Sequence, residues 1–307
     1  MLNTMRRSEQ AVIWRENLRT FRVAAWLGWQ IEGNWTDPLA FLIFTILRPL
    51  ASALIVVVMY QVIAGGERTA FFSYLYISNA FFVLVIQVMS GMAWAIMEDR
   101  EEYKMLKYIY TSPARKFAYL LGRAVAKTAL GLLTTFILLT TGALFLGLSL
   151  PFDHIAWGWL AIYFVLGMII LAGLGIVLGG IALVVARNGG AIGEVTAGML
   201  LLFSSAYFPP DVLPPGIQQI SLALPVTYWL EGMRRAVVGG ILSGPVPTAS
   251  GPVIQPISPM LAQWNDGQLL AIVFVCAVLS AVLSLLFYRR VEHWAKERGM
   301  IDRTTGF

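Results

Sequence analysis

Residues 155–186 read IAWGWLAIYFVLGMIILAGLGIVLGGIALVVA, a stretch without a single acidic, basic or histidine residue. A helix needs about 20 apolar residues to cross a lipid bilayer, and this stretch is longer. The composition agrees, because 58% of the 307 residues are hydrophobic and only 13% are charged, whereas soluble domains carry about 25% charged residues. The sequence therefore predicts an integral membrane protein.

Similar apolar runs predict an all-α fold with six transmembrane helices, because a barrel would show alternating strands of about ten residues instead. We expect the spans at residues 39–63, 72–97, 125–147, 155–186, 191–208 and 268–288. Within this transmembrane domain, 39–288, residues 98–124 form a charged loop and 209–267 a connection rich in proline and glycine. A basic tail follows at 289–307. The first run begins only near Leu39, so we expect no cleavable signal peptide.

Residues 1–38 combine a basic face with a stripe of large apolar side chains. The apolar stripe contains Trp14, Leu18, Phe21 and Ala25, followed by Trp26 and Trp29, and the basic face contains Arg15, Arg19 and Arg22. This spacing is typical of an amphipathic helix, and tryptophans favour the lipid headgroup region. We expect an interfacial helix, with an ordinary solvated helix as the alternative.

Lysine and arginine are distributed unequally between the two sides of the predicted bundle. The N-terminal segment, the loop at 98–124 and the tail at 289–307 carry most of them, whereas the opposite loops hold only Arg68, Arg234 and Arg235. The positive-inside rule therefore predicts that both termini are cytoplasmic and that 209–267 lies outside. Because the basic residues flank apolar spans, nucleic acid is not an expected partner.

The sequence contains no recognisable catalytic, cofactor or metal-binding pattern. The single cysteine, Cys276, excludes an internal disulfide and a cysteine-based metal cluster. The chain lacks the G-x-x-x-x-G-K-S/T loop that binds ATP phosphates, and Gly173, Gly175 and Gly179 lie inside an apolar span, where they favour helix packing. We therefore expect a protein that is not an enzyme and binds no metal or cofactor itself.

Arg48, followed by Pro49, is the one charge deep within a predicted span. An arginine at a helix centre costs about 2.5–3.5 kcal/mol on insertion scales, so its presence calls for an explanation. Arg48 either faces a cavity or bridges helices at the break that Pro49 makes, or it extends to the cytoplasmic interface. Both interpretations stay open at the level of sequence.

Two segments outside the spans have helical patterns of their own. In the cytoplasmic loop, Asp99 and Glu102 fit a capping box that would open a short helix. One face of that helix would carry Tyr103, Leu106, Ile109 and Tyr110, and Ser112-Pro113 would begin the next helix. On the outer side, Pro215 and Thr227 can each start a short helix, which predicts a re-entrant hairpin or an external lid.

In this order and spacing, these segments resemble the permease subunits of type-2 ABC exporters over roughly residues 10–290. The matching pieces are the N-terminal helix, Arg48-Pro49-Leu50, Glu98-Asp99-Arg100-Glu101, Ser112-Pro113, Tyr119-Leu120-Leu121-Gly122-Arg123, Phe208-Pro209, Leu213-Pro214, Leu224-Pro225-Val226-Thr227-Tyr228 and Arg234-Arg235. The outer connection departs from the family pattern by an extension from Gly244 to Trp264.

The resemblance implies a dimer with a second permease, identical or related, around a central pathway in the cell membrane of a prokaryote. Two cytoplasmic ATPase subunits, which bind ATP and magnesium, would dock below. Residues 98–116 would form the coupling helix, with contacts from Glu98, Asp99, Arg100, Glu101, Tyr103, Leu106, Ile109 and Tyr110. This loop is also the one cytoplasmic segment that combines adequate length with an apolar face, which could fill a groove on the ATPase.

The same resemblance places the pathway along the second and fifth spans. The large side chains there are Phe81, Phe82, Met89, Phe203 and Tyr207, each of which could instead face lipid or the core. The outer hairpin would form an external gate, with candidate residues Pro214, Pro225, Tyr228, Glu231 and Arg234.

The expected function is that of a membrane subunit of an ATP-driven exporter with an amphiphilic cargo such as a lipid, glycolipid, drug or polymer. The alternative from another class is a secondary transporter or channel without an ATPase partner. The shortage of titratable groups in the middle of the spans argues against ion coupling. An intramembrane enzyme is disfavoured by the lack of a catalytic grouping.

Overall fold

The computed structural model describes residues 2–33, 39, 42–63, 70–112, 115–148, 150, 152–185, 188–248 and 251–299. Within these residues, five helical stretches are long and apolar enough to cross a membrane, at Thr45–Val62, Ala70–Glu102, Lys116–Phe145, Trp157–Val184 and Asp266–Glu297. A further apolar helix, α9 (Gly189–Phe203), has 15 residues, fewer than the roughly 20 that a full crossing needs. The predicted fifth span is therefore shorter than its apolar sequence suggested.

The first two spans contain π-helical turns. In the first, η1 (Leu42–Leu47) leads into α3 (Arg48–Ile63). The second consists of α4 (Ala70–Val85), the π-helical η2 (Ile86–Ser90), α5 (Gly91–Met97) and a second π-helical turn, η3 (Glu98–Glu102). The predicted capping box at Asp99 is wrong, because the helix of the second span continues through Asp99 to Glu102. The residue before η3 is Met97, and no side-chain cap is present there.

The remaining long helices extend beyond the apolar runs. They are α7 (Lys116–Phe145), α8 (Trp157–Val184) and α13 (Asp266–Glu297). Helix α7 begins inside the predicted loop 98–124, and α13 continues through much of the predicted tail. Hydropathy marks where lipid solvates a helix, whereas polar residues with good helix propensity extend it into the interface.

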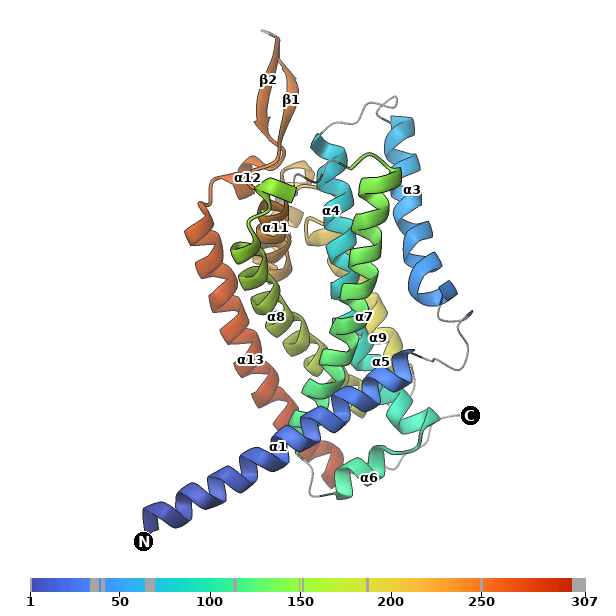
Figure 1. Ribbon diagram of the computed structural model, residues 1–307, viewed down its shortest axis with the longest axis vertical. Helices are drawn as coiled ribbons and strands as arrows, with labels where there is room; N and C mark the ends of the chain where they lie inside the picture. The colour runs from blue at the N-terminus through green and yellow to red at the C-terminus, as the bar shows by residue number, and fades with distance from the viewer. Residues whose placement is uncertain are drawn as a thin grey trace.

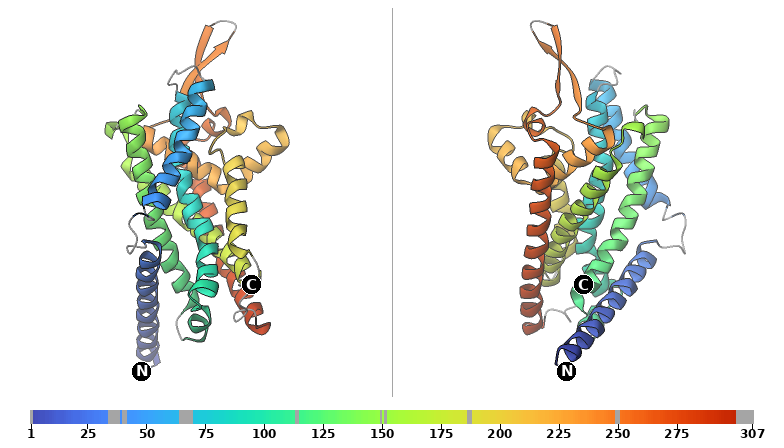
Figure 2. Two further views of the ribbon diagram at one scale, coloured as in Figure 1. Left: turned by 90° about the vertical axis from the view of Figure 1, so that its right-hand side faces the viewer. Right: turned by 60° about the vertical axis from the view of Figure 1, so that its left-hand side comes forward.

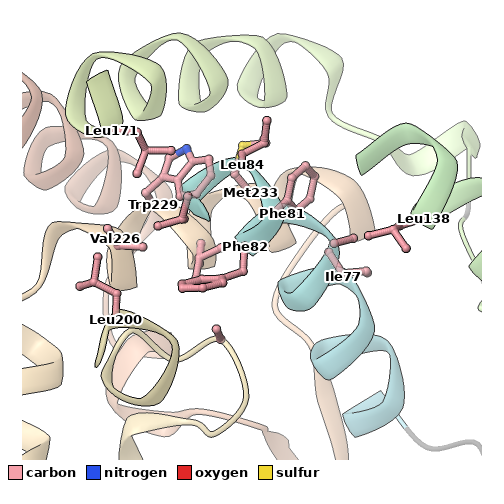
Figure 3. Packing of buried hydrophobic residues seen from close by; sticks show 14 of the residues in the cluster. Ile77, Phe81, Phe82, Leu84, Leu138, Leu171, Leu200, Val226, Trp229 and Met233 are labelled. Atoms are coloured by element: carbon pink, nitrogen blue, oxygen red, sulfur yellow. The ribbon is translucent and has the colours of Figure 1, made fainter. Parts of the chain in front are cut away.

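The second span lies at the centre of the bundle. Its apolar window is 72% buried, against 22–39% for the other four candidate spans. Side chains of α4 such as Ile77 and Phe82 pack against Leu138 of α7, Leu171 of α8 and Leu200 of α9 (Figure 3). The second span therefore has other helices around most of its circumference and can transmit a displacement to each of them.

Helix α1 (Leu2–Gly33) lies obliquely across the N-terminal part of α7, and its own N-terminal end points away from the bundle (Figures 1 and 2). The crossing depends on small residues. A Cβ at Gly122 would lie 2.6 Å from the Phe21 carbonyl oxygen and 2.7 Å from the Ala24 Cβ. Glycine thus allows the two backbones to approach closely, as small residues do in membrane helix pairs.

The outer end of the bundle is built from short elements between α9 and α13. These are η5 (Pro210–Val212), α10 (Pro215–Ala223), α11 (Pro225–Val238), the strands β1 (Ser243–Thr248) and β2 (Gly251–Pro256), and α12 (Pro259–Ala262). The strands pair antiparallel, with Ser243 opposite Pro256 and Thr248 opposite Gly251, and project beyond the helices (Figure 1).

The β-hairpin departs from the predicted all-α fold. It occupies part of the unexplained extension Gly244 to Trp264. The prolines of this segment argue against strands at the level of sequence, because proline has no N–H to donate to a neighbouring strand. Both strands of a two-stranded sheet are edge strands, however, and proline is tolerated there.

Candidate functional site

A cavity of about 590 Å³ lies between the first, second and fifth spans. Its wall is formed by the start of α3, by α4, η2 and α5, and by α9, which face the viewer in the left view of Figure 2. The polar part of the wall contains Arg48, Ser52, Asn79, Gln87, Ser90, Glu98, Lys127, Glu194 and Tyr207, and the apolar part includes Phe82, Val83, Ile86, Trp94 and Leu201. A cavity with both kinds of wall suits an amphiphilic ligand.

The π-helical turn η2 contributes the polar residues in the middle of the cavity. Ile86, Gln87 and Ser90 all belong to this turn and line the wall. The Ser90 hydroxyl donates to the carbonyl oxygen of Gly193 over 2.8 Å and thereby joins η2 to α9. A π-turn widens a helix locally and is frequent at functional sites. Here it joins the second and fifth spans at the cavity.

Arg48 lies on the cavity wall with an exposed side chain. Of the two interpretations left open by the sequence, this placement favours the cavity-facing one. No ion pair or hydrogen bond joins Arg48 to another side chain in the part of the chain that the structure describes. Its guanidinium donors are therefore available to a ligand in the cavity.

The predicted pathway residues divide into two groups. Phe82 and Tyr207 line the cavity, and the Tyr207 hydroxyl lies 3.5 Å from Asn79 Oδ1. Phe81 and Met89 are buried in the core between helices, and Phe203 is half-buried and does not line the cavity. The predicted pathway role of Phe81 and Met89 is not supported by their placement, because both are buried in the core and neither lines the cavity.

The predicted contact residues Glu98 and Asp99 lie inside a buried charge cluster rather than on a free surface. The Arg123 guanidinium donates to Glu98 Oε2 over 3.0 Å and lies 3.6 Å from Asp99 Oδ1. The Tyr119 hydroxyl donates to Asp99 Oδ2 over 2.7 Å. A further ion pair joins Lys127 of α7 to Glu32 of α1. This cluster fastens the C-terminal end of the second span to α7, and α7 to α1.

Arg100 fastens the same turn to the fourth span. Its guanidinium donates to the carbonyl oxygens of Ala182, Leu183 and Val185 over 3.2–3.4 Å. These are carbonyls at the C-terminal end of α8 that the helix itself leaves without partners, and a cation is favourable there. Arg100 also pairs with Glu101 over 2.9 Å. Glu98, Asp99 and Arg100 therefore hold three helix ends together.

The short helix α6 (Leu106–Thr111) follows this anchored turn. Its apolar face differs from the prediction, because Leu106 is only 3% exposed and packs with Ile109 and Tyr110 against α1, α7 and α13. The hydroxyls of Tyr110 and Tyr288 are hydrogen-bonded, and burial raises the pKa of Tyr110. The exposed surface of this segment consists of Glu102, Tyr103, Lys104, Lys107, Tyr108 and Thr111.

We predicted that Leu106, Ile109 and Tyr110 fill a groove on the ATPase. This prediction is wrong for the arrangement described here, because these side chains pack against the chain itself. Tyr108, which is 66% exposed, replaces them as the large apolar group on the outward surface. Tyr103 remains on that surface as predicted. The next helix was predicted to begin at Ser112-Pro113, and Pro113 lies outside the described residues.

On the outer side, α11 is buried rather than laid over the bundle. Trp229 is fully buried, and its indole N–H donates to the Tyr163 carbonyl oxygen over 2.9 Å. Arg234 donates to Ser78 Oγ over 2.7 Å and to the Ser205 carbonyl oxygen over 2.9 Å, and it lies 4.0 Å from the Tyr74 ring centroid. Arg234 thus ties α11 to α4 and to the turn that ends α9.

Glu231 forms ion pairs with both neighbouring arginines. It pairs with Arg234 over 2.8 Å and with Arg235 over 2.9 Å, and Arg235 also pairs with Asp266 over 3.0 Å. Burial alone would raise the pKa of Glu231, but the two guanidinium groups and their hydrogen bonds outweigh burial and hold that pKa below its ordinary value. Glu231 is therefore a carboxylate that stabilises the position of α11.

The other predicted gate residues have structural positions in the hairpin. Helix α10 begins at Pro215 as predicted, with Pro214 directly before it, whereas α11 begins at Pro225, two residues before the predicted start at Thr227. The half-buried Tyr228 donates its hydroxyl to the Leu222 carbonyl oxygen over 2.8 Å and thus holds the two helices together. The more exposed part of the hairpin is α10 with η5, where Val212 and Ile220 lie on the surface.

Comparison with known proteins gives two matches. Residues 10–238 match the family model of the ABC-2 type transporter. Over 200 residues, the chain is 28% identical to the "Probable doxorubicin resistance ABC transporter permease protein DrrC" of Mycobacterium tuberculosis, in strains CDC 1551 / Oshkosh and ATCC 25618 / H37Rv. These alignments cover 64% of this chain and 63% of the length of the two relatives.

Proposed function

The chain belongs to the ABC-2 type transporter family, and from this premise we propose that it is the membrane subunit of an ATP-driven exporter. The cargo is an amphiphile, taken from the cytoplasm or the inner leaflet, and the complex lies in a bacterial cell membrane with both termini of this chain in the cytoplasm. The relatives are described as permeases of a drug-resistance ABC transporter, which is consistent with an amphiphilic cargo.

The observation that carries this proposal is the cavity between the first, second and fifth spans. Its apolar wall accommodates a hydrophobic body, and its polar wall offers the free guanidinium of Arg48 and the amides of Asn79 and Gln87. The cavity lies on one face of the bundle. A second permease, identical or related, would complete the pathway by covering that face.

The energy would come from two cytoplasmic ABC ATPase subunits, which hold ATP and magnesium. The exposed surface of α6 with Tyr103 and Tyr108 is the candidate docking surface. Because Arg100, Asp99 and Glu98 fasten the preceding turn to α7 and α8, a push on α6 would move the ends of three helices together. The second span would carry that movement to the cavity.

The test is reconstitution of the chain with its ABC ATPase in liposomes, with a panel of anionic, cationic and neutral amphiphiles as cargo. We expect ATP-dependent movement of at least one amphiphile and stimulation of hydrolysis by it. The carboxylate of Glu194 on the cavity wall keeps an ion-coupled transporter as the competing function. Uptake or release by the chain alone under a proton gradient would favour that competitor.

A further inference from the structure

A groove of about 910 Å³ lies where α1 crosses α7, and we call it the α1–α7 groove. Its wall contains Arg15, Arg19, Arg22 and Trp26 of α1 and Val125 and Ala129 of α7, among others. It shares no residue with the cavity described above. An occupant of this groove would therefore bind independently of the cargo.

Three arginines stand on one face of α1 along this groove. Arg15, Arg19 and Arg22 are spaced by four and three residues, so they project from successive turns on the same side. All three are exposed. None forms an ion pair with a side chain in the described part of the protein. This face of α1 therefore attracts anions, because no carboxylate of the described residues pairs with its arginines.

The groove becomes apolar toward the span. Trp26 is 65% exposed, and Val125 and the small Ala129 continue the wall on α7. Beyond the groove, the same side of α7 presents the exposed side chains Leu132, Leu133 and Phe136 at helical spacing. These three belong to a candidate membrane span, so hydrocarbon surrounds them.

The order of these groups along the groove matches the polarity of a phospholipid. Trp26 follows the three arginines along α1, and the exposed apolar side chains of α7 continue from Val125 to Phe136. The N-terminal end of α1 points away from the bundle, whereas α7 runs through the bundle (Figure 1). Guanidinium groups bind phosphate through paired hydrogen bonds, and tryptophan favours the level just below the headgroups. A soluble protein partner would cover the arginines but could not extend along a hydrocarbon-facing stripe.

We propose that the α1–α7 groove binds one anionic glycerophospholipid of the membrane leaflet on the α1 side. The phosphate and the acidic headgroup lie among Arg15, Arg19 and Arg22, and one acyl chain passes Trp26 and Ala129 to run along Leu132 and Phe136. The lipid holds the angle between α1 and α7. Since Glu32 of α1 is paired with Lys127 of α7, the bound lipid also supports the charge cluster at the end of the second span.

The experiment is native mass spectrometry of the purified full-length chain, released from nanodiscs that contain equal amounts of phosphatidylglycerol and phosphatidylcholine. We expect the parent chain to retain phosphatidylglycerol in preference. The variant R19Q/R22Q should bind it about 30-fold more weakly, because each interfacial arginine contributes about a fivefold factor to anionic-lipid binding. The matched control R290Q/R298Q removes the same charge from the exposed cytoplasmic end of α13 and should retain the lipid like the parent.

A second variant, Ala129→Phe, fills the apolar half of the groove without changing charge and should also lose the preference. Glycerophosphate, the soluble headgroup analogue, should not compete with the lipid. Three results would each overturn the proposal: equal retention of the two lipids by the parent, an equal loss in R19Q/R22Q and R290Q/R298Q, or full competition by glycerophosphate. The measurement needs no ATPase or cargo, so its outcome is independent of the proposed export activity.

Discussion

The Arg123 guanidinium donates to the Glu98 carboxylate over 3.0 Å and so joins the third span to the last turn of the second. Arg123 is 1% exposed and also faces Asp99. Buried charges in such a cluster depend on one another, because each loses its hydration and keeps only its partners. The pair therefore acts as a joint between the bundle and the turn that precedes α6.

Replacement of Arg123 by methionine should destabilise the chain strongly. Asp99 would lose its main buried counter-charge and Glu98 one of two, and breaking a buried pair from one side typically costs about 3–5 kcal/mol. Thermal unfolding of the purified chain in detergent measures the effect. Arg115→Met removes an exposed arginine just before the same helix and should leave the transition unchanged; similar transitions for both variants would contradict the joint.

A methyl group at Gly167 should displace α11 from the bundle. A Cβ there would overlap the Trp229 indole, whereas a Cβ at Gly158 of the same helix meets no atom within 4 Å. We expect Gly167→Ala to lower the free energy of unfolding by about 1–3 kcal/mol through overpacking. Gly158→Ala is the matched control. Equal stability of the two variants would show that α11 does not pack on α8 as described.

The surface of α6 should respond differently at its two faces. Tyr108→Asp changes a side chain that is exposed, so the chain should insert and unfold like the parent but lose co-purification with the ABC ATPase. A buried interfacial anchor commonly contributes about 2 kcal/mol or more. Leu106→Asp places a charge in the chain's own core, so it should lower the stability of the chain itself before any effect on ATPase binding. Retained ATPase binding by Tyr108→Asp would exclude this face as the docking surface.

Arg48→Gln should change transport without changing stability. The guanidinium has no protein partner within the described residues, so its loss leaves no buried group unpaired. A hydrogen bond to a charged group contributes about 1.5–3 kcal/mol, so the cargo concentration for half-maximal stimulation of ATP hydrolysis should rise about tenfold or more. Arg290→Gln, at an exposed position near the C-terminal end of α13, is the control. An unchanged concentration dependence in Arg48→Gln would remove Arg48 from the cargo site.

The sequence predicted the long helices well because lipid solvation imposes uniform apolar runs. It could not show which way an amphipathic face points: the stripe of Leu106, Ile109 and Tyr110 has the same pattern whether it packs inward or binds a partner. The partners of Glu98 were also hidden, because Arg123 follows it by 25 positions and reads as a topology-setting charge. A signal existed in the excess of acidic residues at 98–102 beside basic residues on the next span.

The outer elements were predicted in part. Pro215 marked the start of α10 correctly, because proline at the first turn of a helix has a local cause. Helix α11 begins at Pro225 and not at the predicted Thr227. The burial of α11 depends on Gly167 and Gly232, which lie close to Trp229 and Tyr163, and such tertiary packing leaves no local pattern. Residues Phe81 and Met89 illustrate the same limit, since a large apolar side chain suits a cavity wall and a core equally well.

We propose that this chain moves an amphiphile with energy from a partner ATPase. The most direct test is transport in liposomes that contain the chain alone or the chain with a partner ABC ATPase, each with ATP, without ATP and with a proton gradient. We predict that the chain alone neither hydrolyses ATP nor moves cargo, and that the complex moves cargo only with hydrolysable ATP. ATP hydrolysis by the chain alone, or cargo movement by the chain alone under the proton gradient, would contradict the account.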